Sequence, residues 1–236
     1  MLMMRDHDVQ DYVALRDMDA TDVGLLSEDD RACLGELGQY LISTKAWQRF
    51  AIWLLHKHFE PASGEVFVER ALDGPRRTET TPVGRPAFSA HALSATAVRF
   101  DPDVSSGVGV VGMEFADPAD FGSTSPLSAD DAMALAGIAD LLHAHGKTER
   151  FGVRLIRDPL SLSDCEVLFE TCDIEQRTLH CRVAERSGLP AHKIVETTWW
   201  WKPGLDKAGP TVMQYCGVVC VPSGDTHSWM HDALGT

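Results

Sequence analysis

The chain has 236 residues, with 21 Lys and Arg against 35 Asp and Glu. Its formal net charge of −14 at pH 7 argues against binding to a nucleic-acid backbone, because such binding needs clustered basic residues. Hydrophobic residues make up 44% of the chain, as in ordinary globular proteins, and no run reaches the roughly 18 apolar residues of a membrane span. Because the N-terminal stretch lacks the apolar segment of a secretory signal, we expect a cytoplasmic protein that binds neither nucleic acid nor membranes.

The sequence contains an internal duplication. Residues 26–69 align without a gap with residues 127–170, at an offset of 101 positions, and 12 of the 44 aligned pairs are identical, where composition alone would give about three. A period this long indicates a duplicated half-domain rather than a solenoid repeat. We therefore predict an N-terminal segment (1–25), a first half (26–125) and a second half (126–236), with the two halves packed as one compact unit about a pseudo-twofold axis.

A helix is predicted near the start of each half. Ser27 and Ser128 are followed by acidic residues, a pattern typical of a helix N-terminus. The leucine and isoleucine residues after them recur at helical spacing. These signals predict helices at 28–43 and 129–144.

Strands are predicted after each helix. Alternating apolar residues indicate strands at 49–59 and 65–70 in the first half, joined by a turn, and at 150–158 and 166–171 in the second. Further strands are expected at about 94–101, 107–115, 195–202 and 211–221, whereas the prolines and glycines of residues 72–87 favour a loop. Each half is thus a helix followed by an antiparallel sheet, and the predicted fold class is α+β.

A pair of histidines, His56 and His58, ends the first predicted strand. Alternation along a strand places both imidazoles on one side, and two such groups can bind a zinc, iron, copper or nickel ion. The alternative is a pair of hydrogen-bonded or solvated histidines at a strand end. In the second half Arg157 stands at the position of His56, and it is a candidate to bind an anionic substrate group.

A second candidate metal site lies at the C-terminus, where Cys216, Cys220, His227 and His231 form a Cys2His2 set. Two thiolates and two imidazoles are typical ligands of a structural zinc ion. The two cysteines would lie roughly 13 Å apart on an extended strand, so both reach one ion only if the strand bulges, with Gly217 as the candidate. The alternative is buried thiols and two histidines in a frayed tail.

Three consecutive tryptophans lie in a predicted strand of the second half. Trp199 and Trp201 align with Val98 and Phe100 of the first half, so we expect them in the core. Trp200 should face outward. It is then an interface anchor, part of a ligand platform, or simply a partly exposed side chain.

These features favour a metal-dependent enzyme that acts on a small substrate, with a divalent zinc or iron ion held by the histidine pair. The alternative is a non-catalytic acidic binding or adaptor protein on the duplicated scaffold, with a protein partner and any zinc structural. A homodimer is compatible with both hypotheses. We expect the histidine pair to be the functional centre, because two ligands leave coordination positions open whereas a filled Cys2His2 set leaves none.

Overall fold

The computed structural model describes residues 2–5, 8–18, 23–72, 76–84, 93–101, 108–117, 120, 127–156, 162–189, 194–206 and 209–220. The helices there are α1 (Val9–Val13), α2 (Glu28–Ser43) and α3 (Ala129–Ala144), with the 3-10 turns η1 (Ala46–Gln48) and η3 (Arg186–Gly188). The strands are β1 (Leu2–Arg5), β2 (Phe50–Leu54), β3 (Glu65–Ala71), β4 (Arg77–Gly84), β5 (Ser94–Asp101), β6 (Val108–Ala116), β7 (Phe151–Leu155), β8 (Glu166–Asp173), β9 (Thr178–Glu185), β10 (Val195–Asp206) and β11 (Gly209–Cys220).

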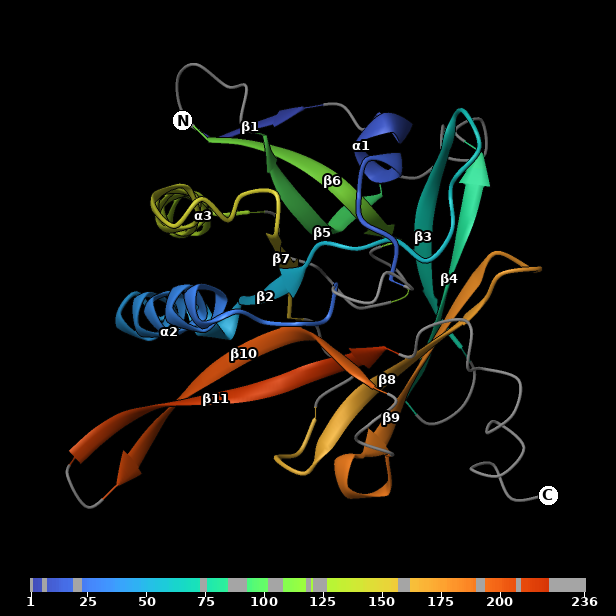
Figure 1. Ribbon diagram of the computed structural model, residues 1–236. Helices are drawn as coiled ribbons and strands as arrows, with labels where there is room; N and C mark the ends of the chain where they lie inside the picture. The colour runs from blue at the N-terminus through green and yellow to red at the C-terminus, as the bar shows by residue number, and fades with distance from the viewer. Residues whose placement is uncertain are drawn as a thin grey trace.

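Ten of these strands form one closed ring, a β-barrel (Figure 1). Their order is β6, β3, β4, β9, β8, β11, β10, β2, β7 and β5, and β5 pairs with β6 to close the ring, while β1 runs alongside β6. The α+β prediction of two helix-plus-sheet units is therefore wrong, because both halves contribute strands to a single barrel. Counterpart elements still begin 101 residues apart, as Phe50 and Phe151, or Glu65 and Glu166, show.

The fold-class prediction failed at β2. This strand pairs with β7 and β10, both from the second half, and not with β3 as a hairpin would require. All five of its residues are buried, which is typical of a central strand covered on both faces. It also ends at Leu54 rather than at residue 59.

The segment predicted as a loop at 72–87 contains strand β4. It pairs with β3 from Thr78 to Gly84 but with β9 only from Arg77 to Thr80. Pro82 lies beyond that last pairing, where the strand has one neighbour and a missing N–H group is tolerated. The proline thus lies where β4 is paired on one side only, and local composition cannot distinguish such a strand end from a loop.

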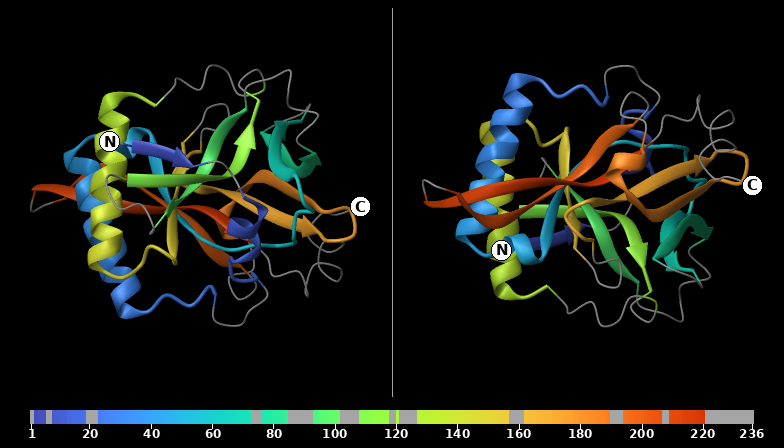
Figure 2. Two further views of the ribbon diagram at one scale, coloured as in Figure 1. Left: turned by 90° about the horizontal axis from the view of Figure 1, so that it is seen from above. Right: turned by 90° about the horizontal axis from the view of Figure 1, so that it is seen from below.

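The two long helices lie side by side against one side of the barrel (Figure 2). Their predicted bounds are confirmed, and each begins with a capping box, at Ser27 and at Ser128. One apolar cluster joins them to the outer faces of β2 and β7, through Leu34, Leu37, Leu41, Leu135, Ile138, Leu142, Phe50, Ile52, Leu54, Phe151 and Val153. Among the described residues, no helix is both long and apolar enough to cross a membrane.

The inside of the barrel is partly polar. Since successive residues of a strand point to opposite faces, Trp53 of β2 and Arg154 of β7 point inward, and Trp53 packs there with Tyr12 of α1 and with Phe67. Three glutamates of the barrel are also buried: Glu69, Glu114 and Glu170 are 3%, 3% and 4% exposed. Burying charge is costly unless it is paired, so the inside of the barrel is where chemistry is expected.

Candidate metal centre

Two histidines turn into the barrel directly after β2. The strand ends at Leu54, and Lys57 then points outward, with its Nζ 2.7 Å from Oε1 of Glu60. The alternation of β2 breaks after Leu55, which packs inside the barrel with Trp53, and His56 and His58 both point inward, where their Nε2 atoms are 3.2 Å apart. They are 3% and 6% exposed.

Two more donors come from neighbouring strands of the second half. Glu170 of β8 and Cys220 of β11 are partners in the parallel ladder, so their side chains leave the sheet on the same face. They are 4% and 0% exposed. The Cys220 Sγ lies 2.9 Å from Glu170 Oε1 and 3.3 Å from Thr197 Oγ1.

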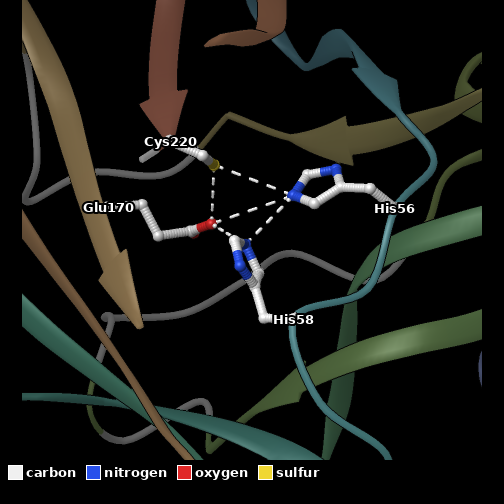
Figure 3. Close-up of side chains that lie close together, drawn as sticks. All are labelled: His56, His58, Glu170 and Cys220. Carbon is white, nitrogen blue, oxygen red and sulfur yellow. Dashed lines mark hydrogen bonds and ion pairs between the residues drawn. The ribbon is translucent and has the colours of Figure 1, made fainter. Parts of the chain in front are cut away.

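The four side chains converge on one point (Figure 3). The Nε2 atoms of His56 and His58 are 3.2 Å apart. Oε1 of Glu170 lies 3.0 Å from Nε2 of His58 and 4.0 Å from Nε2 of His56. Sγ of Cys220 lies 3.7 Å from Nε2 of His56, and the four donor atoms all lie within 4.8 Å of one another.

The orientation of His56 suits a metal ligand. Its Nδ1 lies 2.7 Å from the carbonyl oxygen of Leu54, and only a protonated Nδ1 can donate to that oxygen. The lone pair is then on Nε2, which faces the other donors. A ring nitrogen fixed by a backbone carbonyl is the usual support of a metal-binding histidine.

Burial controls the protonation of the cluster. Loss of hydration, together with the neighbouring His58, lowers the pKa of His56 to about 3, so this imidazole is neutral. Burial also raises the pKa of the Cys220 thiol well above its usual value, and the Glu170 charge raises it further. Burial would also raise the pKa of the Glu170 carboxyl. The hydrogen bond with His58 and the electrostatic interactions with His58 and Arg154 outweigh burial, so this pKa is lowered.

These donors fit one divalent ion. Metal–ligand bonds of about 2.0–2.3 Å in a tetrahedral site place the ligand atoms roughly 3.3–3.8 Å apart. Five of the six donor separations, 2.9 to 4.0 Å, fall on either side of that range, and the sixth, between His58 and Cys220, is within 4.8 Å. Two neutral imidazoles, one carboxylate and one thiolate would carry two negative charges, which such an ion would neutralise. An ion would also reverse the thiol's preference for its protonated form, because metal-bound thiols lose their proton.

The first half has a related arrangement without the donors. Glu69 is the counterpart of Glu170, and its ladder partner is Ala116 where Glu170 has Cys220. Each half thus has this glutamate, but only Glu170 has a cysteine as its ladder partner.

An arginine supplies the positive charge beside Glu69. Arg154 places its Nη2 2.6 Å from Oε2 of Glu114. Burial alone would lower the pKa of this guanidinium, but Glu114 and Glu69 raise it. Trp53 stands at the counterpart position, 101 residues earlier, so Glu170 faces the histidine pair instead.

The structure divides the predicted C-terminal set. It brings Cys220 to the histidine pair, whereas the side chain of Cys216 and the whole of His227 and His231 lie outside the described residues. The predicted irregularity at Gly217 is present: Val218 pairs with Thr198 and Cys216 with Trp199, so Gly217 has no partner in this ladder. Arg157 also lies outside the described residues, and its role stays a prediction.

The tryptophans lie largely as expected. Trp199 and Trp201 are each 1% exposed and belong to the apolar cluster under the helices, which confirms their core assignment. Trp200 is partly buried, and its Nε1 has no hydrogen-bond partner among the described residues.

Sequence reasoning missed Glu170. This residue is identical to its counterpart Glu69, as expected of a position that serves the fold in both halves, so the repeat does not single it out. The available signal was a glutamate at the end of an apolar strand in both halves, in EVFVE and EVLFE. A carboxylate in such a position needs a positive partner, which the sequence does not identify.

Comparison with known proteins gives no relative: no protein-family model, no curated protein and no solved structure matches this chain.

Proposed function

We propose that this protein binds one divalent transition-metal ion inside its barrel through His56, His58, Glu170 and Cys220. The observation that carries the proposal is the convergence of four buried donor atoms of ligand type within 4.8 Å. Nitrogen, sulfur and oxygen ligands together favour zinc, and iron is the alternative.

The role that the geometry supports best is structural. Four protein ligands fill a tetrahedral site, as in structural zinc sites, and all four residues are buried. The ion would join the segment after β2 to β8 and β11 and so connect the two halves. On this proposal the chain is a metal-stabilised binding protein rather than an enzyme.

A metal-dependent enzyme is the second candidate, and a cavity favours it. This cavity, of about 250 Å³, includes Cys181 in its lining, and Cys181 is the ladder partner of Glu170. A substrate in the cavity would contact Cys181, the neighbour of the proposed ligand Glu170 on the adjacent strand. Catalysis would require one ligand, such as the carboxylate, to leave and open a coordination position.

The first experiment measures metal in protein purified without a histidine tag. We expect about one zinc or iron ion per chain by elemental analysis, and a lower Tm after chelation. The combined substitution His56→Ala and His58→Ala should abolish binding. The matched control is His143→Ala with His145→Ala, a second pair at the same spacing near the end of α3, which should leave binding intact. Less than about 0.2 ion per chain, with Tm unchanged by chelation, would refute the proposal.

Cobalt substitution separates the two roles. A filled site should keep its visible spectrum when azide or cyanide is added, because no position is open. A spectrum that shifts on addition would show an open position and would favour the enzyme.

A further inference from the structure

The cavity beside the metal centre has features of a ligand site in its own right. Its volume is about 250 Å³, and its lining passes from exposed Gln48 and partly exposed Lys202 to buried Glu69 and Thr198. The cavity therefore leads from the surface toward the inside of the barrel. It is somewhat smaller than the usual 300–1,000 Å³ of drug-sized pockets, so its ligand should be small.

Three aromatic side chains contribute to the wall. Trp47, Trp200 and Trp201 all line the cavity. The face of an indole ring attracts cations, most strongly where water is excluded. Trp200 was expected from the sequence to be an interface anchor, a ligand platform or a partly exposed side chain, and its place in this wall favours the platform.

The buried charges near the cavity are predominantly negative. Three buried glutamates, Glu69, Glu114 and Glu170, face a single guanidinium, that of Arg154. A metal ion bound with the Cys220 thiolate would leave the metal centre neutral, so the excess beside the cavity persists with or without the ion.

The basic groups of the lining are already matched by carboxylates. Nη2 of Arg154 lies 2.6 Å from Oε2 of Glu114, and Nζ of Lys202 lies 3.0 Å from Oδ1 of Asp164. Glu69 lines the cavity itself, and it shares the single guanidinium of Arg154 with Glu114, so these three groups together carry one negative charge. An anion would meet this carboxylate at short range, whereas a cation would be attracted by both the carboxylate and the tryptophans.

A hydrogen-bonding group of the lining also lacks a partner. Thr198 is 2% exposed, and its Oγ1 has no hydrogen-bond partner among the described residues. A buried hydroxyl without a partner costs free energy. An ammonium group that donates a hydrogen bond to this oxygen would remove the cost.

We propose that this cavity binds a small organic cation, a primary or substituted amine with an apolar body. The tryptophans contact the apolar body and the cationic group, Glu69 supplies the opposite charge, and Thr198 accepts a hydrogen bond. The proposal does not depend on the metal ion.

Three probes of similar size and different charge test the proposal: benzylamine, benzyl alcohol and benzoate. Binding is measured by calorimetry and by ligand-observed NMR near neutral pH and physiological salt, where benzylamine is a cation. Benzylamine should bind at least about tenfold more tightly than either of the others. Benzoate binding as tightly as benzylamine, or no benzylamine binding at millimolar concentration, would overturn the proposal.

Variants distinguish the cavity from general attraction to an acidic protein. Glu69→Gln removes one charge with little change in shape and should abolish the preference for benzylamine over benzyl alcohol. The matched control is Glu79→Gln on the paired strand β4, where Glu79 is partly exposed, and it should preserve the preference. A preference that survives Glu69→Gln would contradict the proposal.

A second variant keeps the test decisive if Glu69→Gln does not fold. Trp200→Leu changes a partly exposed wall residue and should weaken benzylamine binding by about tenfold. Unchanged binding in this variant would also count against the site.

Discussion

At the scale of single residues, two identical buried glutamates have different partners. Glu69 lies near the guanidinium of Arg154, and Glu170 lies 3.0 Å from Nε2 of His58. A buried carboxylate needs such a partner because the desolvation cost is otherwise several kcal/mol. The duplication preserved the carboxylate, and the halves then diverged in the group that pairs with it.

This divergence predicts unequal effects of one substitution at equivalent positions. Glu170→Gln should lower the metal affinity by about 100-fold or more, because it removes a ligand. Glu69→Gln should leave affinity within a few-fold while lowering stability. Competition with a chromogenic chelator measures both. Equal losses in the two variants would show that Glu170 is not a ligand.

Cys220 has a spectroscopic test. A thiolate bound to cobalt gives an intense charge-transfer band in the near ultraviolet, and Cys220→Ser should remove it while cobalt still binds more weakly. Cys165→Ser is the control, since Cys165 is exposed. A band that persists in Cys220→Ser would exclude the thiolate from the site.

The sequence located part of this centre. The spacing of His56 and His58 correctly predicted that both imidazoles lie on one side. The side itself was predicted wrongly, because the histidines were expected to share the face of Phe50, Ile52 and Leu54, which packs under the helices, and β2 ends before the histidines. Glu170 is 112 residues from His58 along the chain and meets it only when β2 is inserted into the second half. No local pattern carries that information.

At the scale of elements, the identical positions of the repeat form reciprocal ion pairs. Arg49 binds Asp131 through two nitrogens, at 3.3 and 3.1 Å, and its counterpart Arg150 lies 3.8 Å from Asp30. These aspartates are the third residues of helices α2 and α3, and each accepts the hydrogen bond from its N-cap serine backbone in the capping box. Each half thus contributes an arginine to the helix N-terminus of the other, as in a symmetric dimer.

A second reciprocal set joins the strands. Arg76 contacts Glu166 at 2.7 Å, and Arg177 contacts Glu65 at 2.6 Å. Both arginines have positive φ, 54° and 53°, an uncommon conformation for residues other than glycine. These residues are identical between the halves, but sequence identity alone does not show that they pair across the halves.

The helix pairs predict a loss of stability in acid. Burial would raise the pKa of Asp30 and Asp131, but Lys147 acts on Asp30, and Ser128 and Arg49 act on Asp131, so that both pKa values are lowered. A carboxyl whose pKa is lower in the folded state stabilises the protein above its unfolded pKa, here 3.8, and this contribution is lost as pH falls below it. Asp131→Asn should therefore flatten the dependence of Tm on pH below about pH 5.

A double-mutant cycle gives the magnitude. Arg49→Ala combined with Asp131→Asn should show a coupling of about 0.5–1 kcal/mol in urea unfolding near neutral pH, since the pair is partly exposed. The coupling should decrease at low pH. A coupling near zero at neutral pH would mean that the pair does not stabilise the fold.

At the scale of the whole molecule, β2 and β7 make the barrel a single unit. β2 lies between β10 and β7, and β7 lies between β2 and β5. Both described neighbours of β2 therefore belong to the other half. The sequence indicated the strands and their repetition, but a strand pattern does not specify its partner, and this is why the halves were predicted as separate sheets.

The exchange of β2 predicts that neither half folds alone. A fragment of residues 26–125 keeps the pairings among β3, β4, β5 and β6 but loses both partners of β2, which exposes the fully buried Phe50 and Ile52 and leaves unpaired strand edges that favour aggregation. We expect this fragment and its complement to lack cooperative thermal unfolding by circular dichroism, and the full chain to show one transition that metal shifts upward. Two of the proposed ligands, His56 and His58, come from the first half and the other two, Glu170 and Cys220, from the second. Metal binding should therefore appear only when both halves are present. A fragment that unfolds cooperatively by itself would show that the half, rather than the closed barrel, is the folding unit.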